Sequence, residues 1–256
     1  MRIGFVEWPE GLTAAQLRAH EMSVRVSAAA PEILVTNELP FGPWIADTPG
    51  YSEDTARASV RAHETGLDAL RALDVPAVIS SRPVWHEGRL ANEAFVLENG
   101  EVRVLHRKQY FPDEAGFYEK QWYAPGGTGF VPAEIGGLKV GVLLCTEALF
   151  NEHARRYGRQ GVDLIVIPRA TTREGLDMWR TAAAMASYVS GAYVVSSNRS
   201  GTSSRGTTYD GAGFAYGPHG RFLAATSALA PVAVIELDRA LVWEARDDYP
   251  CYVSEH

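Results

Sequence analysis

Cysteine is scarce in this chain: among 256 residues, only Cys145 and Cys251 carry a thiol. Two cysteines make no disulfide framework, and no group of histidines and cysteines has the spacing of zinc ligands. We therefore expect no metal. Basic runs are also missing, and the formal net charge is −7. This balance argues against a nucleic-acid partner and against an anionic membrane surface.

Long apolar runs are missing as well. No stretch approaches the roughly 20 apolar residues of a membrane span, and the N-terminal residues MRIGFVEWPEG have no charged lead before a long apolar region. We expect a soluble, cytoplasmic protein. The composition, 46% hydrophobic and 21% charged, is typical of a globular chain. Without a linker, a heptad repeat or a low-complexity tract, the sequence predicts one domain over residues 1–256.

Short apolar runs alternate with segments of helical period. The predicted strands are 3–7, 33–36, 76–81, 90–98, 102–106, 130–135, 138–144, 164–167, 193–197 and, near the C-terminus, about 211–216, 221–226 and 232–236. The predicted helices are 10–29, 53–73, 148–161, 177–190 and 238–246. This order indicates a layered α/β fold with mixed sheets, and a two-sheet sandwich between helix layers suits it.

Three chemically distinct side chains follow predicted strands. Cys145 ends the apolar run 138–144 and precedes a helical segment, so its thiol lies at a strand-to-helix turn. Glu38 and Lys108 stand at two other strand ends. A thiol, a carboxylate and an ammonium suffice for nucleophilic acyl transfer, because the carboxylate can take the thiol proton and the ammonium stabilises the thiolate and an oxyanion. The backbone N–H of Thr146, at the helix start, is a second oxyanion donor.

Each of these residues also has an ordinary interpretation. A free cysteine is often a small buried hydrophobe, a glutamate can cap a loop, and most lysines are solvated. Alternatively, the thiol could belong to a Cys-His hydrolase, in which a histidine is the base. It would need His106 or His219, and neither lies in a recognisable cysteine-protease context.

Four separated motifs, in order, resemble those of the nitrilase superfamily, the carbon–nitrogen hydrolases. They are ILVTNELPFG (33–42), NEAFVLENGEVRVLHRK (92–108), KQYFPDEAGFYEKQWYAPGG (108–127) and GVLLCTEALFNEHARRYGRQGVDLIVIPRA (141–170). The segments SNRSG (197–201) and DGAGFAYGPHGR (210–221) are similar to the C-terminal half of the family. The likeness thus spans nearly the whole chain.

The resemblance implies a four-layer αββα sandwich and a Glu-Lys-Cys triad that needs neither a metal nor an organic cofactor. Glu38 would be the general base, Lys108 the stabiliser of the oxyanion and Cys145 the nucleophile. A second glutamate assists the lysine; Glu114 and Glu119 compete, and the context E-K-Q-W-Y-A-P-G favours Glu119. The family also commonly forms homodimers or larger homo-oligomers, and we expect helix 177–190 to contribute to that contact.

The reaction class follows from the same comparison. Nitrilases of this family usually have Trp-Glu after the cysteine and a longer C-terminal tail, whereas this chain has Thr146 and Glu147 and ends at residue 256. The resemblance therefore implies cleavage of a non-peptide C–N bond in a small amide or N-carbamoyl amine, through a cysteine thioester. A nitrilase and a catalytically idle binding homologue are the alternatives. We expect Glu147 to bond backbone N–H groups at the turn.

The substrate pocket is harder to predict. Arg169 and Arg173 follow the strand 164–167 and would pair with a substrate carboxylate, or else lie on the surface. Aromatic residues, Trp44 and Tyr110 among them, would form an apolar wall or belong to the core.

Overall fold

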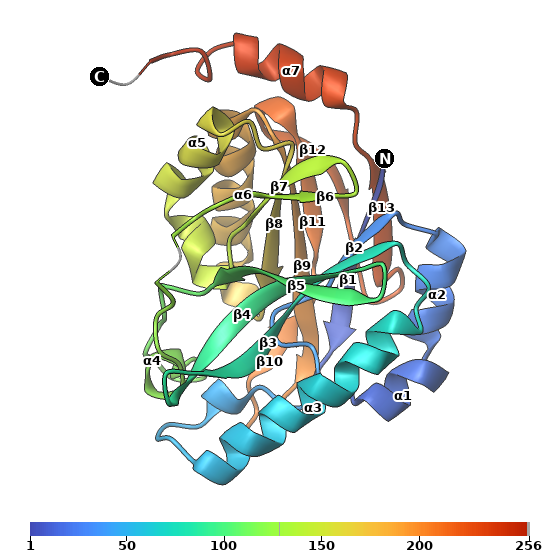
Figure 1. The fold of residues 1–256 in the computed structure, drawn as a ribbon, viewed down its shortest axis with the longest axis vertical. Coiled ribbons are helices and arrows are strands. Elements are labelled where there is room, and N and C mark those ends of the chain that lie inside the picture. Colours follow the sequence, from blue (N-terminus) through green and yellow to red (C-terminus); the bar gives the residue numbers. More distant parts are fainter. Residues whose placement is uncertain (128, 255–256) are drawn as a thin grey trace.

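Two mixed β-sheets pack face to face, and helices cover the outer face of each (Figure 1). The structure is a computed structural model that describes residues 1–127 and 129–254. A core of aliphatic side chains from both sheets fills the interface between them, among them Ile3, Val35, Val142 and Val166. The arrangement is the four-layer αββα sandwich that the sequence predicted.

The first sheet contains the N-terminal strands. Its members are β1 (Arg2–Pro9), β2 (Ile33–Val35), β3 (Ala77–His86), β4 (Arg89–Glu98), β5 (Glu101–Arg107) and β13 (Val232–Glu236). Strands β1, β2 and β3 run parallel, and the hairpins β3–β4 and β4–β5 extend the sheet on one side. The β4–β5 turn is Asn99-Gly100, and both residues have positive φ, as the predicted hairpin requires.

The second sheet carries the other half of the sandwich. Its members are β6 (Ala133–Ile135), β7 (Leu138–Val142), β8 (Leu164–Arg169), β9 (Tyr193–Thr202), β10 (Thr208–Asp210), β11 (Phe214–Gly217) and β12 (Arg221–Ala225). Strands β7, β8 and β9 are parallel, so their carboxyl ends reach one edge. The end of β1 pairs with β9 in parallel, from Glu7 opposite Asn198 to Pro9 opposite Ser200, and this pairing joins the two sheets.

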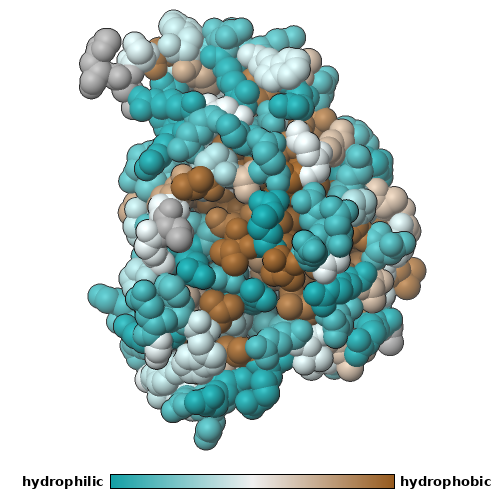
Figure 2. Space-filling view, in the orientation of Figure 1, coloured by the Kyte–Doolittle hydropathy of each residue, from teal (hydrophilic) through white to brown (hydrophobic). Residues whose placement is uncertain are grey.

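The outer layers are formed by the helices α1 (Ala14–Ala19), α2 (Glu21–Ala29), α3 (Glu53–Arg71), α5 (Asn151–Arg159) and α6 (Leu176–Ser190). The helices α4 (Glu119–Trp122), in the loop after β5, and α7 (Arg239–Asp247), near the C-terminus, lie outside these layers (Figure 1). Apolar residues of α1, α2 and α3 pack on the first sheet, and those of α5 and α6 pack on the second. In the view of Figure 2, hydrophobic residues gather near the middle of the face, and hydrophilic ones cover most of its rim. None of the helices in residues 1–127 and 129–254 is long and apolar enough to span a membrane.

Local capping changes two of the predicted helices. Residues 10–29 form two helices because His20 is extended, and its ring accepts a hydrogen bond from the N–H of Met22 to start α2. The segment after Cys145 also divides, into a 3-10 helix at Cys145–Leu149 and then α5. Strands β8 and β9 extend beyond their predicted ends at residues 167 and 197, to Arg169 and Thr202 respectively.

Candidate active site

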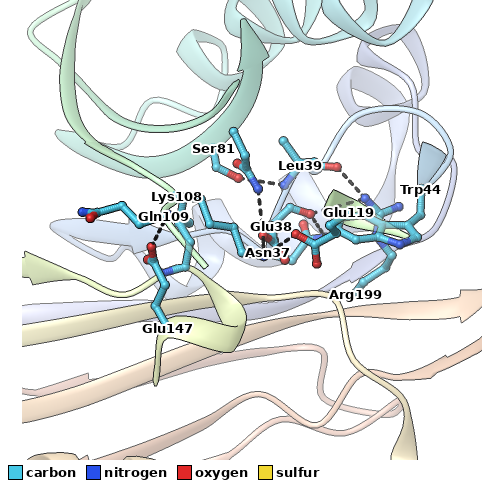
Figure 3. Close-up of polar contacts among 12 residues, drawn as sticks. Asn37, Glu38, Leu39, Trp44, Ser81, Lys108, Gln109, Glu119, Glu147 and Arg199 are labelled. Carbon is cyan, nitrogen blue, oxygen red and sulfur yellow. Dashed lines mark hydrogen bonds and ion pairs between the residues drawn. The ribbon is translucent and has the colours of Figure 1, made fainter. Parts of the chain in front are cut away.

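The ends of strands from both sheets bring three predicted residues together. Glu38 follows β2 and Lys108 follows β5 in the first sheet, and Cys145 follows β7 in the second. The Glu38 N–H donates to the Arg169 carbonyl at 3.2 Å, so the end of β2 lies against the end of β8. Lys108 Nζ lies 2.7 Å from Glu38 Oε1, and both side chains are fully buried (Figure 3). Cys145 is also buried.

A second carboxylate shares the lysine. Glu119, at the start of α4, places Oε2 at 2.5 Å from Lys108 Nζ and is fully buried. Figure 3 shows the Glu38 and Glu119 carboxylates reaching toward the lysine. Glu114, the other glutamate considered, is exposed, and its backbone bonds Phe117 within the same loop. The contact that the resemblance implies is therefore made by Glu119.

Glu38 is held on one side only. Its Oε1 accepts both Lys108 Nζ and the side-chain amide of Asn92, at 2.7 and 2.8 Å. Its Oε2 has no hydrogen-bond partner among the described residues, although it is buried. The Asn37 side-chain amide and the Arg199 guanidinium donate to the Glu38 carbonyl oxygen. The carboxylate is thus fixed in orientation while one oxygen stays open to a proton.

Burial and the neighbouring charges set the protonation of the cluster. Burial raises the pKa of Glu119 to about 8; the charge of Glu38 adds to this rise and Lys108 opposes it. Burial alone would lower the pKa of Lys108, but Glu119 and Glu38 hold it well above its usual range. Burial and the charge of Glu38 raise the pKa of the Cys145 thiol, against the opposing effect of Lys108. The thiol is therefore protonated at neutral pH and needs a base to become a nucleophile.

A strained turn presents the thiol. Cys145 has φ +49°, in the left-handed region that a residue with Cβ rarely adopts. Glu147 supports the turn: its buried carboxylate accepts the N–H of Leu144 at 2.8 Å and the N–H of Gln109 at 2.7 Å. The predicted role of Glu147 at backbone N–H groups is confirmed. His106 Nε2 contacts the same carboxylate at 2.8 Å, which the sequence analysis did not anticipate.

A cavity of about 480 Å³ opens above the thiol. Cys145, Thr146 and Glu119 line it. Its apolar wall is formed by Pro112, Phe117, Leu149, Ala170, Met178 and Trp179. This volume suits a small organic molecule. Among the described residues, no group of three or more His, Cys, Asp or Glu side chains could hold a metal ion.

The four residues predicted to contact substrate are not among those that line this cavity. The buried Arg169 guanidinium donates to Ser196 Oγ, Thr171 Oγ1 and the Ala212 carbonyl, at 2.7, 2.7 and 3.0 Å. Arg173 is exposed in a 3-10 turn, Arg173–Gly175.

The two aromatic residues of that set have partners of their own. The buried Trp44 donates from Nε1 to the Gly116 carbonyl at 3.2 Å. The Tyr110 hydroxyl lies 2.8 Å from His153 Nε2. Asn92 and Arg199 were missed as site residues, although both fall within the quoted motifs 92–108 and 197–201.

Comparison with known proteins identifies the family. The sequence profile of the carbon–nitrogen hydrolases matches residues 18–247, and the chain belongs to this family. N-carbamoylputrescine amidase of Solanum lycopersicum is 32% identical over 146 residues, which cover 52% of this chain and 49% of that protein. The chain thus spans about half the length of such curated relatives.

Solved structures share the fold. The carbon–nitrogen hydrolase of Helicobacter pylori G27 superimposes with a TM-score of 0.84 at 23% identity, covering 98% of this chain and 94% of that one. An amidase of the nitrilase superfamily from Nesterenkonia AN1 gives a TM-score of 0.77 at 18% identity, covering 96% and 94% of the two chains. Both agree with the four-layer sandwich.

Proposed function

We propose that this chain hydrolyses a C–N bond of a small amide or N-carbamoyl amine through a thioester on Cys145. The observation that carries the proposal is the buried Glu38–Lys108 contact beside the buried Cys145 thiol at a cavity of small-molecule size. No step requires a metal or an organic cofactor. Because the machinery draws on both sheets, we infer that residues 1–256 act as one catalytic domain.

The reaction begins when Cys145 Sγ attacks the carbonyl carbon and Glu38 takes the thiol proton through its open Oε2. The Lys108 ammonium and the Thr146 N–H stabilise the oxyanion. As the tetrahedral adduct collapses, the C–N bond breaks, Glu38 returns the proton to the leaving nitrogen, and ammonia or an amine departs. Glu38 then deprotonates a water molecule that attacks the thioester, and the released thiol regains its proton.

Glu119 assists without touching the thiol. Its carboxyl group contacts Lys108 Nζ at 2.5 Å and aims Nζ at the position of the oxyanion. Trp44, Tyr110, Arg169 and Arg173 support the walls of the pocket from behind or beside the cavity in this proposal. Arg169 does so through the bond from Nη1 to Thr171, a residue of the cavity wall.

Relatives support a nucleophilic cysteine. In a structure of a mutant of the Nesterenkonia sp. AN1 amidase, the acetamide moiety of fluoroacetamide is added covalently at the active-site cysteine. The tomato relative carries the name of an N-carbamoyl amine hydrolase. Amide and carbamoyl substrates are therefore preferred here over nitriles.

The decisive test is ammonia release from a panel of amides, N-carbamoyl amines and nitriles. We expect turnover of an amide or carbamoyl compound, its loss in Cys145→Ala, and a mass increase on wild-type Cys145 in quenched reactions. Turnover that survives Cys145→Ala would overturn the scheme. Turnover of nitriles alone would favour a nitrilase, and silence across the panel with an unreactive thiol would favour a binding homologue.

We also propose a homodimer or larger homo-oligomer in which α6 contributes to the contact. Its outer face exposes Met178, Met185 and Tyr188, each 40–50% accessible. Sedimentation that shows a stable monomer would exclude this arrangement.

A further inference from the structure

The charged residues that line the cavity are all of one sign. They are Glu114, Glu119 and Glu174, and the described lining contains no lysine, arginine or histidine. Glu114 comes from the loop after β5 and Glu174 from the 3-10 turn before α6, so two segments distant in sequence place glutamates at one cavity.

Burial orders these carboxylates from floor to opening. Glu119 is fully buried beside Lys108, whereas Glu114 and Glu174 are exposed and therefore mark the opening. The same lining contains apolar residues, Phe117 and Leu149 among them. A ligand with its reactive group at Cys145 would thus cross an apolar span before it reaches the outer carboxylates.

The floor leaves one polar atom without a partner. Glu119 Oε1 is buried and has no hydrogen-bond partner among the described residues. A buried carboxyl oxygen without a partner is costly, and the amide or ureido group of a substrate would satisfy it. This oxygen therefore points to a ligand with a polar reactive end.

Nearby cations do not neutralise the opening. The Arg169 guanidinium bonds Ser196, Thr171 and Ala212 and does not line the cavity. Arg173 is outside the lining, and its charge acts on Asp210. Hydrogen bonds from its own backbone N–H and from Thr172 lower the pKa of Glu174, which keeps that carboxylate ionised at neutral pH.

We propose that the substrate is a cationic amide or N-carbamoyl amine, whose ammonium end is held by Glu174 and Glu114 at the opening. Its carboxamide or ureido group forms a hydrogen bond with Glu119 Oε1 at the floor, and its alkyl chain lies along the apolar wall. The inference rests on the proposed hydrolase function. The competing assignment is a substrate carboxylate that pairs with Arg169 or Arg173.

The test uses a series of aliphatic primary amides of one length that end in an ammonium, a methyl group or a carboxylate, with a matching N-carbamoyl series. We expect the highest kcat/KM for the ammonium member and the lowest for the carboxylate member. Glu174→Gln should lower kcat/KM for the ammonium member about three- to fivefold, near the upper limit for an exposed ion pair. It should leave the methyl member unchanged. Glu114→Gln should act in the same direction, and added salt should weaken the preference.

Glu64→Gln, an exposed carboxylate on α3 away from the cavity lining, is the matched control and should change no member of the series. Calorimetric binding of the ammonium amide to Cys145→Ala, with and without Glu174→Gln, gives a readout independent of turnover. Equal kcat/KM for the three amides, or a preference for the carboxylate, would overturn the cationic assignment while leaving the hydrolase intact. No turnover of any member would instead reject the hydrolase function, and the substrate assignment with it.

Discussion

The side-chain amide of Asn92 donates to the same oxygen of Glu38 that Lys108 holds, at 2.8 Å against 2.7 Å. The backbone carbonyl of Asn92 also accepts the backbone N–H of Lys108, at 2.9 Å. One buried residue therefore positions both Glu38 and Lys108. Because both donors act on Oε1, Oε2 remains for proton transfer.

Asn92→Leu should lower kcat about 10- to 100-fold, since a hydrogen bond to a charged group contributes about 1.5–3 kcal/mol. KM should change little, because Asn92 does not line the cavity. Steady-state kinetics measure both, and urea unfolding checks that the fold persists. A raised KM with an unchanged kcat would contradict a role in orienting the base.

Glu38→Gln should separate thiol acidity from catalysis. Turnover should fall by about 10³-fold or more because the base is lost, a deficit within the usual range of general-base catalysis. The pKa of the Cys145 thiol should fall, because the negative charge of Glu38 contributes to raising it. The pH midpoint of iodoacetamide alkylation, measured in a Cys251→Ser background, reports this pKa. An unchanged or higher midpoint would mean that Glu38 does not act on the thiol.

Glu119 should make stability depend on pH. Its folded-state pKa of about 8 exceeds the ordinary value of 4.5, so between these values the folded protein keeps a proton that the unfolded chain loses. The contribution to stability is full below about pH 4.5, decreases as pH rises and levels off above about 8. Glu119→Gln should lack this slope. Urea unfolding of both proteins from pH 5 to about 9 measures it, and parallel curves would refute the raised pKa.

Arg199 should matter for stability. Its buried guanidinium pairs with Glu10 and donates to the carbonyl oxygens of Glu38, Leu39 and Gly42. Arg199→Met should cost about 3–5 kcal/mol in the free energy of unfolding, because the Glu10 carboxylate loses its partner.

Two further variants test whether the loss of stability in Arg199→Met comes from the buried ion pair. Adding Glu10→Gln should recover part of it. Arg25→Met, which breaks the exposed pair with Glu21, should cost less than about 1 kcal/mol. A loss for Arg199→Met no greater than that of Arg25→Met would show that the buried pair adds little.

Apolar periodicity predicted the layers and most strands because the strands are buried and carry continuous apolar runs. The apolar pattern did not predict the helix breaks at His20 and Phe150, because each depends on a local backbone angle that the pattern does not encode. The grouping of Glu38, Lys108 and Cys145 could be predicted because strand ends can be recognised in the sequence. Asn92 and Arg199 were missed because their importance lies in contacts between residues distant along the chain. The Arg169 side chain forms its hydrogen bonds behind the cavity, and this orientation likewise depends on packing that the sequence does not show.

The strand pairing between β1 and β9 has a consequence for how the protein loses activity. Glu38 and Lys108 come from one sheet and Cys145 from the other, so under the proposed mechanism neither sheet holds a working site alone. A partly unfolded molecule with one sheet separated would be inactive even if every catalytic side chain kept its local backbone conformation. Activity should therefore disappear no later than the first structural transition on heating. The residual activity should equal the fraction of molecules in which the two sheets remain packed together.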